Sequence, residues 1–335
     1  MSDQQVSPGP SPKTTNATSA GFVTTAITVL NIALGFGFQS LIAFALGLGA
    51  LADAFQLTWA IVTFGTTVFY TLVTTVLVPR VHDGSNSVRL GDARHLAVFG
   101  TIATALQVFA AIFTAQPLTD LLLYSAPSHL LAAITAPAVT LAYLEHRFAL
   151  AAIGNVYNGL GLLAAAAIAV GAGPTPANLG IALTAGYTTQ FLLTALPLRN
   201  NLRSVDWRAA IGTRSIVGLI LFTMLTKLQP VLERTISESF GIGSTAALGF
   251  GQKISQGLLL LGAFGLAITA TGSLSRAFAS GDGPLTARLF GRTLISTFIT
   301  STLIIAFFIP FSRLSVQILF QRGEFTAYDT NSVFS

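Results

Sequence analysis

The chain has 335 residues, of which 52% are hydrophobic and only 9% are charged. Soluble domains carry about 25% charged residues, so this composition excludes an ordinary soluble domain and indicates a protein that crosses a membrane many times. The absence of cysteine excludes disulfide bonds and thiolate metal sites. The 17 basic and 12 acidic residues form no continuous basic stripe, so membrane topology explains the basic excess better than nucleic-acid binding does.

The first 20 residues are rich in Ser, Thr, Pro and Gln, a composition typical of a disordered tail. They lack the basic start of a signal peptide, and the apolar run that follows is long enough to span a bilayer. We therefore expect an uncleaved cytoplasmic tail over residues 1–20.

Long apolar runs recur along the rest of the chain. A helix needs about 20 such residues to cross a bilayer, and this criterion predicts an all-α polytopic membrane protein with about nine crossings. The predicted crossings are 22–46, 55–79, 95–115, 128–145, 149–171, 178–197, 215–239, 245–273 and 289–311.

Basic residues are distributed unevenly between the loops. The loops after the first, third, fifth and seventh crossings contain no Lys or Arg, whereas those after the even-numbered crossings contain Arg80, Arg89, Arg94, Arg147, Arg199, Arg203, Arg208, Arg214, Arg276, Arg288 and Arg292. Because basic loops are retained in the cytoplasm, this pattern places the N-terminus and the even-numbered loops inside the cell. The last segment departs from it, since Arg313 and Arg322 fall on the predicted outer side.

A basic polar linker, residues 199–214, separates six predicted crossings from three. Trp207 lies in its middle, as in an amphipathic helix on the anionic inner leaflet. The segment VPRVHDGSNSVRL after the second crossing resembles LSRAFASGDGPLTARL after the eighth, which indicates parallel repeats of the kind found in some transporters. We predict a six-helix lobe over residues 21–198 and a partial second lobe of three helices over 215–335.

The seventh crossing, residues 215–239, carries four charged residues, namely Lys227, Glu233, Arg234 and Glu238. Charged side chains are costly inside a bilayer and persist where they face water, a partner or a substrate. Pro230 lies among them and is expected to bend the helix. In one interpretation the charges neutralise one another, with Arg234 and Glu238 paired at helical spacing. In the other, Lys227 stays unpaired on a cavity wall at the middle of the membrane.

An unpaired lysine at this depth would attract an anion, and Lys253 in the eighth crossing would add to it. Lysine binds phosphate as a compact charge, so the two residues suit a phosphate or pyrophosphate headgroup. In the first crossing, Asn31 and Gln39 are able to line the same cavity, although the glycines near them also favour close helix packing. Asp53, at the outer mouth of the second crossing, is either a helix N-cap or part of a gate.

No enzyme site is recognisable in the sequence. The four histidines show no metal-ligand spacing and are interpreted as interfacial residues with solvated tips: His82, His95, His129 and His146. We find no P-loop, no Ser/His/Asp arrangement and no paired carboxylates in one loop. We therefore expect no cofactor, and the missing P-loop argues against direct drive by ATP within this chain.

Several motifs also resemble a known family. They are AFALGLGALADAF and the later VPRV, then LERTISESFGIGSTAALGFGQKI, RAFASGDGPLTARL and LFQRGEFTAYDT, of which the last is the most specific. Over residues 22–330 the chain resembles the MurJ/MviN flippases of the multidrug/oligosaccharidyl-lipid/polysaccharide exporter superfamily. The resemblance implies two helical lobes around a cationic cavity. It also implies transfer of lipid II, an undecaprenyl-pyrophosphate-linked peptidoglycan precursor, to the outer leaflet.

The resemblance assigns roles to individual residues. Asp53 matches the family's acidic residue after the first crossing, and Lys253 falls at a cavity arginine. Glu233 falls where members carry an acidic residue, which implies a monovalent-cation site. We therefore expect gating or ion coupling from Asp53, Glu233 and Arg234, and substrate binding from Lys227, Lys253, Asn31 and Gln39.

The chain departs from the family in two ways. Ile32, Phe38 and Gln39 stand where the family has charged residues in its first crossing, and Thr66 stands at a further cavity arginine. Members of the family also continue beyond the last crossing found here. We therefore expect the chain to be C-terminally truncated, or to need a partner that completes its second lobe.

The predicted function is alternating-access translocation of lipid II across the bacterial inner membrane during cell-wall synthesis. Export of another lipid-linked saccharide, such as an exopolysaccharide or O-antigen unit, is the alternative that the reduced arginine lining favours. A non-transporting membrane scaffold that binds cell-wall synthesis partners is a third hypothesis.

Overall fold

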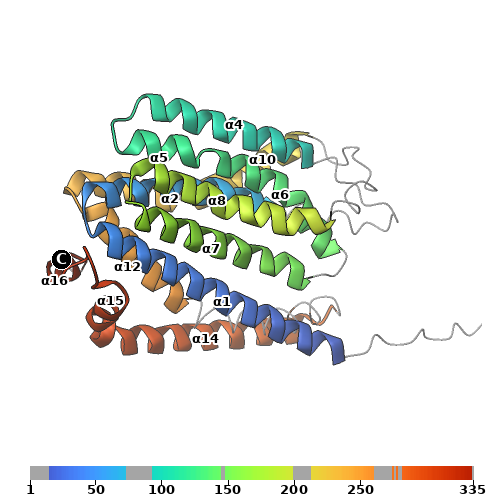
Figure 1. The fold of residues 1–335 in the computed structure, drawn as a ribbon. Coiled ribbons are helices and arrows are strands. Elements are labelled where there is room, and N and C mark those ends of the chain that lie inside the picture. Colours follow the sequence, from blue (N-terminus) through green and yellow to red (C-terminus); the bar gives the residue numbers. More distant parts are fainter. Residues whose placement is uncertain are drawn as a thin grey trace, which may run out of the picture.

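The computed structural model describes residues 15–72, 93–144, 148–198, 213–259, 274, 277 and 281–333. Every element within these ranges is helical, which confirms the all-α prediction (Figure 1). The α-helices are α1 (Thr15–Leu46), α2 (Ala50–Leu72), α4 (Ala93–Ile112), α5 (Leu118–Ser125), α6 (Pro127–Leu144), α7 (Phe148–Gly171), α8 (Pro176–Ala195), α10 (Thr213–Lys227), α11 (Gln229–Ser237), α12 (Ser244–Leu259), α14 (Gly283–Phe308), α15 (Ser312–Phe320) and α16 (Ala327–Ser332). Short 3-10 helices follow three of them, at Leu196–Leu198, Glu238–Phe240 and Ile309–Phe311.

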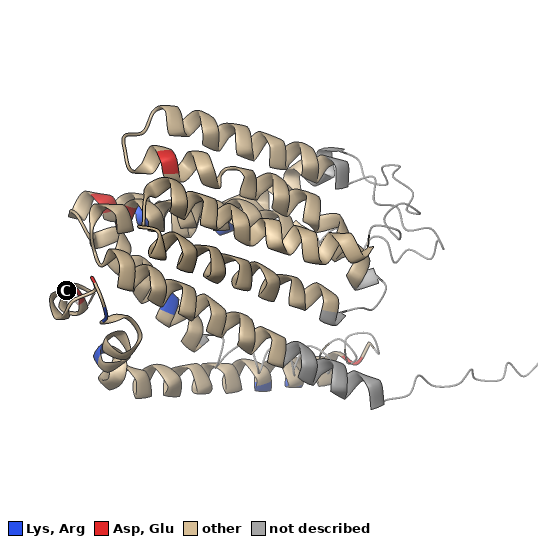
Figure 2. Cartoon of the chain, viewed as in Figure 1, with Lys and Arg blue, Asp and Glu red and all other residues tan. Residues whose placement is uncertain are grey.

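The described part of the chain contains 6 helical segments that are long and apolar enough to cross a membrane, and each overlaps a predicted crossing. They are Ala26–Leu46, His95–Ile112, Leu118–Ala142, Leu150–Gly171, Pro176–Leu198 and Gly283–Phe320. Figure 2 shows that charged residues are sparse along the helices, as contact with lipid requires. The chain is therefore a multi-pass membrane protein.

The other three predicted crossings are described only in part or are interrupted. The second corresponds to α2, whose described residues end at Leu72, and the eighth to α12, which is described to Leu259. The seventh is split at Leu228 into α10 and α11. The remainders of the second and eighth crossings lie outside the described residues.

The fourth crossing begins at Leu118 rather than at residue 128, because α5 and α6 follow each other almost without a break. This earlier start places His129 well inside the helical bundle, where its side chain is 3% exposed. The interpretation of His129 as an interfacial residue with a solvated tip is therefore wrong. His82 and His146 lie outside the described residues.

Several predicted segments lie partly or wholly outside the described residues. Helix α1 begins at Thr15, so it overlaps the end of the predicted tail over residues 1–20, while residues 1–14 lie outside the described residues. The linker predicted over 199–214 is outside them up to residue 212, and so is most of the sequence repeat. The division into two lobes remains a prediction.

Helix α2 occupies the centre of the molecule. It packs against α5 and α6 through one part of its surface and against α10, α11 and α12 through another. Helix α7 packs against both α1 and α8, and α4 lies along α6 (Figure 1). Any movement of α2 therefore affects both the predicted first lobe and the seventh and eighth crossings.

Small residues allow the helices of the predicted first lobe to approach closely. A Cβ atom on Gly186 of α8 would collide with Leu162 of α7, and one on Gly161 of α7 would collide with Thr189 of α8. Lipid supplies no hydrophobic driving force between helices, so packing of this kind holds transmembrane helices together.

The segment after α15 docks on the end of α1. Glu324 donates its backbone N–H to the carbonyl of Phe44 at 2.9 Å, which satisfies one of the free carbonyls in the last turn of α1. Phe325 is buried against Phe250 of α12, with the ring centroids 5.7 Å apart. The loop thus connects α1 with α12 at the end of the bundle that also carries Asp53, on the left of Figure 1.

Gly323 is expected to be required for this docking. Its φ of +59° is in the left-handed region, and a Cβ would also collide with the Phe44 carbonyl. Gly323→Ala therefore combines backbone strain of about 1–2 kcal/mol with a steric clash of similar size. We expect a clearly lower thermal unfolding temperature in detergent.

Gly281→Ala is the matched control. Gly281 has a φ of +71° but open space around its Cβ position. It should therefore show the backbone strain alone. Equal losses of thermal stability in the two variants would contradict the proposed close contact between the loop and α1.

Candidate functional site

A cavity of about 260 Å³ lies between α2, α10, α11 and α12, with one residue of α1 at its edge. Cationic, amide and hydroxyl side chains contribute much of its wall. The lining residues are Gln39, Trp59, Ala60, Thr63, Phe64, Thr67, Lys227, Pro230, Arg234, Gly249, Gln252, Lys253 and Gln256. Four of the seven predicted site residues are among them, namely Gln39, Lys227, Arg234 and Lys253.

The interruption of the seventh crossing sets the positions of two of these cations. Proline has no N–H to donate and its ring clashes with the preceding helical turn, so Pro230 disfavours a continuous helix. Accordingly α10 ends at Lys227, and α11 begins after Leu228. Lys227 and Arg234 both line the cavity, one from each side of the break. The predicted disturbance of the helix at Pro230 is confirmed.

None of the three cations forms an ion pair with a carboxylate in the described part of the chain, although Glu233, next to Arg234 in the chain, acts on the Arg234 charge electrostatically. Arg234 is 6% exposed, and its Nε atom is buried without a hydrogen-bond partner. The ammonium of Lys253 lies 5.9 Å from the centroid of the Phe36 ring and packs against Gly35 of α1. Lys227 is exposed at the end of α10. All three therefore leave positive charge available to an anion.

The acidic residues of α11 and its 3-10 extension are engaged elsewhere or exposed. The carboxylate of Glu233 accepts one hydrogen bond from Gln229 at 2.7 Å and another from Gln252 of α12. Glu238 is exposed and forms no ion pair with Arg234. The Arg234–Glu238 pair expected from helical spacing is therefore not formed, while Glu233 still offsets part of the Arg234 charge electrostatically.

Gln252 is expected to control the charge of the cavity. Gln252→Leu removes the donor that holds Glu233 on α12, which frees a carboxylate next to Arg234. A freed carboxylate competes with an anionic ligand, so we expect binding of a lipid pyrophosphate to weaken by about threefold to tenfold. Gln256→Leu, which changes another cavity amide without touching Glu233, should weaken binding less. Equal effects of the two substitutions would contradict this role of Gln252.

The two polar residues predicted in the first crossing have different surroundings. Gln39 lines the cavity, and its side-chain oxygen accepts a hydrogen bond of 2.8 Å from Gln56 of α2. Asn31 does not line it, since its side chain lies against Gly159 of α7. Its position therefore fits the helix-packing alternative rather than substrate contact.

Two positions at which the family resemblance implies charged residues hold uncharged side chains that point elsewhere. Phe38 is buried, with its ring centroid 5.1 Å from that of Trp59. Thr66 is directed toward α8, where its hydroxyl lies 2.8 Å from the hydroxyl of Tyr187. Position 66 is absent from the cavity wall.

Asp53 connects α2 to the beginning of α12. Its two carboxylate oxygens accept backbone N–H groups from Gly243 at 2.6 Å and from Ala246 at 2.8 Å. Asp53 therefore caps the N-terminus of α12, rather than that of α2, the helix to which it belongs. A carboxylate at a helix N-terminus is favoured by the free N–H groups and by the helix dipole. The contact closes the bundle at this end.

Sequence analysis missed several residues that form the cavity wall. Trp59, Thr63 and Thr67 recur at helical spacing on α2, and Gln252 and Gln256 recur on α12. A search for polar residues at intervals of four in the crossings would have found them. They were overlooked because they carry no charge.

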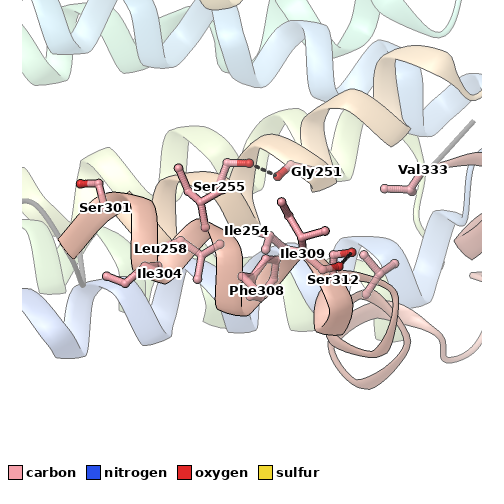
Figure 3. A pocket seen from close by; sticks show the side chains of 12 residues that line it. Gly251, Ile254, Ser255, Leu258, Ser301, Ile304, Phe308, Ile309, Ser312 and Val333 are labelled. Atoms are coloured by element: carbon pink, nitrogen blue, oxygen red, sulfur yellow. Dashed lines mark hydrogen bonds between the residues drawn. The ribbon is translucent and has the colours of Figure 1, made fainter. Parts of the chain in front are cut away.

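A second hollow, of about 500 Å³, lies between α12, α14 and α15 and is the larger of the two. Its lining contains no charged residue, and its polar groups are mainly serine hydroxyls. Figure 3 shows that Ser255 bonds back to the carbonyl of Gly251 in its own helix, at 3.2 Å. This groove is suited to apolar chains and offers no charged side chain to an anion.

The comparisons with known proteins fit this architecture. The family model described as Lipid II flippase MurJ matches residues 95–334. The chain belongs to the MurJ lipid II flippase family. The resemblance inferred from the sequence motifs is thereby confirmed, and the family consists of transporters rather than enzymes.

Two solved structures show the same fold. A lipid II flippase MurJ in an inward closed conformation superimposes with a TM-score of 0.74 at 16% identity, covering 93% of this chain and 70% of the other. A multidrug resistance MATE family transporter of the MOP superfamily, in an inward-facing conformation, gives a TM-score of 0.58 at 14% identity, covering 93% of this chain and 78% of the other. No relative was found among curated proteins.

Proposed function

We propose that this MurJ-family chain translocates a polyprenyl-pyrophosphate-linked peptidoglycan precursor, lipid II, across the bacterial inner membrane. Lys227, Arg234 and Lys253 hold the pyrophosphate in the cavity. Trp59 and the cavity amides contact the first part of the headgroup. The polyprenyl chain stays in the lipid outside the bundle.

The observation that carries this proposal is the set of three cavity cations that form no ion pair with any described carboxylate. Buried or half-buried cations within a membrane are costly unless a ligand or partner compensates them. A pyrophosphate supplies several anionic oxygens, and hydrogen bonds between charged groups contribute about 1.5–3 kcal/mol each. The cavity is therefore complementary to a diphosphate rather than to a neutral lipid.

The Asp53 end of the bundle supports an alternating-access cycle. In this conformation Asp53 and the docked loop around Gly323 close that end. We propose that this end faces outward and that the N-terminus lies in the cytoplasm, as the arginine-rich loops predict. The headgroup then enters from the cytoplasmic side and leaves after the contacts of Asp53 have opened.

Coupling to a monovalent cation or to the membrane potential is part of the same proposal. Glu233 accepts a hydrogen bond from Gln252 of α12. A cation that competes for this carboxylate would release α11 from α12. Because Arg234 is the next residue, such a release would also move a substrate-binding charge.

A second candidate substrate class is another lipid-linked saccharide, such as an exopolysaccharide unit. The uncharged Phe38 and Gln39 favour it, since they stand where the family resemblance leads us to expect charged residues. Both classes share the polyprenyl pyrophosphate and differ in the attached sugars and peptide.

Reconstituted vesicles distinguish the two. Purified protein is incorporated into liposomes with a polyprenyl pyrophosphate that carries a fluorescent headgroup, and an impermeant reductant quenches the outer leaflet. We expect complete quenching with the peptidoglycan precursor, which shows translocation from the inner leaflet. Quenching of only the outer half for this precursor, but complete quenching for a peptide-free oligosaccharide, would support the second class.

A further inference from the structure

A buried polar cluster in the predicted first lobe is separate from the transport cavity. It consists of His129 on α6, Gln107 on α4 and Ser125 at the end of α5, and all three side chains are at most 5% exposed. His129 Nε2 lies 2.6 Å from Gln107 Oε1. Gln107 Nε2 donates to the Leu122 carbonyl and to Ser125 Oγ, each at 2.8 Å.

These contacts determine the protonation of the His129 ring. The orientation of the Gln107 amide is fixed by its partners. If the amide were reversed, its oxygen would face the carbonyl oxygen of Leu122, and two acceptors cannot form a hydrogen bond with each other. Gln107 Oε1 can then only accept, and His129 Nε2 must be the donor. A neutral ring therefore carries its proton on Nε2 and leaves Nδ1 bare. Nδ1 is buried and has no hydrogen-bond partner.

The bare edge of the ring lies against α2. A Cβ atom at Gly65 would collide with Nδ1 and Cε1 of His129, so only glycine leaves room for the ring. Residues of α2 at helical spacing line the transport cavity, including Ala60, Thr63 and Thr67. Gly65 belongs to the opposite side of the helix. His129 therefore contacts the back of a helix whose front forms the cavity wall.

No acidic or accepting side chain among the described residues is bonded to the Nδ1 side of the His129 ring, so this packing does not stabilise a charged ring. The titratable side chains described on the helices packed against α6, and on α5, which supplies Ser125, are the following: Asp53 and Tyr70 on α2, His95 on α4, Asp120 and Tyr124 on α5, Tyr157 on α7 and Tyr187 on α8. None of them is hydrogen-bonded to the ring. Asp53 is twelve positions from Gly65, or about 18 Å along the helix, and its carboxylate is occupied by α12.

We infer that His129 is a proton-binding site, at which uptake of a proton on Nδ1 separates α6 from α2 and changes the shape of the transport cavity. An imidazolium needs an acceptor for its second N–H, and the packed arrangement supplies none. An arrangement in which water reaches Nδ1 supplies one, so protons favour that arrangement by population shift. The inference adds a regulatory input to the proposed function and rests on it only for its consequence in transport.

The first test reads the ring directly. Replacing His82, His95 and His146 by Gln leaves His129 as the single histidine of the chain. Because burial disfavours the charged ring, nitrogen-15 NMR of labelled histidine in detergent is recorded from about pH 8 down to about pH 3, well below the ordinary titration range of histidine. We expect the neutral Nε2–H form at high pH and the doubly protonated form at low pH. A proton on Nδ1 at high pH, or a ring that stays neutral throughout, would overturn the inference.

The second test reads the cavity wall. The chain has no cysteine, so Thr67→Cys supplies one reactive site on the front of α2. The labelling rate of this cysteine is measured in a chain that retains His129 and in one that also carries His129→Gln, whose amide still donates to Gln107. The first rate is divided by the second at each pH, which cancels the ionisation of the thiol. We expect this ratio to rise by about threefold or more on acidification.

Ser239→Cys, at an exposed position between α11 and α12, is the control and should give a constant ratio. A constant ratio at Thr67→Cys as well would overturn the inference. Neither measurement uses a lipid substrate, so failure of the transport assay and failure of this inference are distinguishable. If His129→Gln does not fold, the NMR measurement on the native ring still decides.

Discussion

Replacing Lys227 and Lys253 together by alanine is expected to abolish headgroup translocation in reconstituted vesicles. Both residues line the cavity, and neither has an acidic partner in the part of the chain that the structure describes. Loss of two charge-assisted contacts of about 1.5–3 kcal/mol each lowers binding of the charged headgroup by about 100-fold or more. The initial rate of headgroup quenching at limiting lipid concentration measures the effect.

Arg288→Ala with Arg292→Ala is the matched control. Both are exposed arginines on α14, outside the cavity wall, and the double substitution removes the same net charge. The control should retain most of its translocation rate. If the two double variants lose activity equally, the cavity cations have no specific role.

The second large effect is expected from Asp53→Asn. Asparagine retains one acceptor oxygen but loses the charge and presents an NH₂ group to the N–H groups of Gly243 or Ala246. A charge-assisted bond at a helix N-terminus contributes about 1.5–3 kcal/mol, so the closed state should lose at least about tenfold in population relative to the open state. Thr245→Cys, fully buried beside this contact, should be labelled correspondingly faster in the Asp53→Asn background.

Asp282→Asn provides the control for this prediction. Asp282 also accepts a backbone N–H at a helix N-terminus, from Leu285 of its own α14 at 2.9 Å, and among the described residues its side chain bonds to no other helix. It should leave labelling of Thr245→Cys unchanged. Faster labelling in both variants would show general loosening, and no change in either would exclude Asp53 as a gate.

The apolar runs were sufficient to predict most of the fold, because the bilayer imposes a length and a composition on each crossing. The interruption at Pro230 was also predictable, since proline cannot continue the backbone hydrogen bonds of a helix. The start of the fourth crossing was not. The interruption between Ser125 and Pro127 favours a loop before residue 128, so the sequence predicts His129 at the end of a crossing.

The convergence of Lys227 and Lys253 could be anticipated from the cost of charge in a membrane and from the family resemblance, whereas Arg234, expected to couple an ion, lies in the same cavity wall. The hydrogen-bond partners and neighbours of the other polar site residues could not be anticipated from the sequence. Asp53 contacts residues about 190 positions away, and helical spacing carries no information about such contacts. The same limit applies to Asn31, whose neighbour is Gly159 of α7.

The central claim, that the cavity recognises a pyrophosphate, is tested most directly by binding to the purified chain in detergent. The affinity for a polyprenyl pyrophosphate is compared with that for the uncharged polyprenol of the same length, in the parent protein and in the Lys227→Ala, Lys253→Ala variant. We predict that the parent prefers the pyrophosphate by about tenfold or more and that the variant loses this preference. Equal affinity of the parent for both lipids would contradict the account.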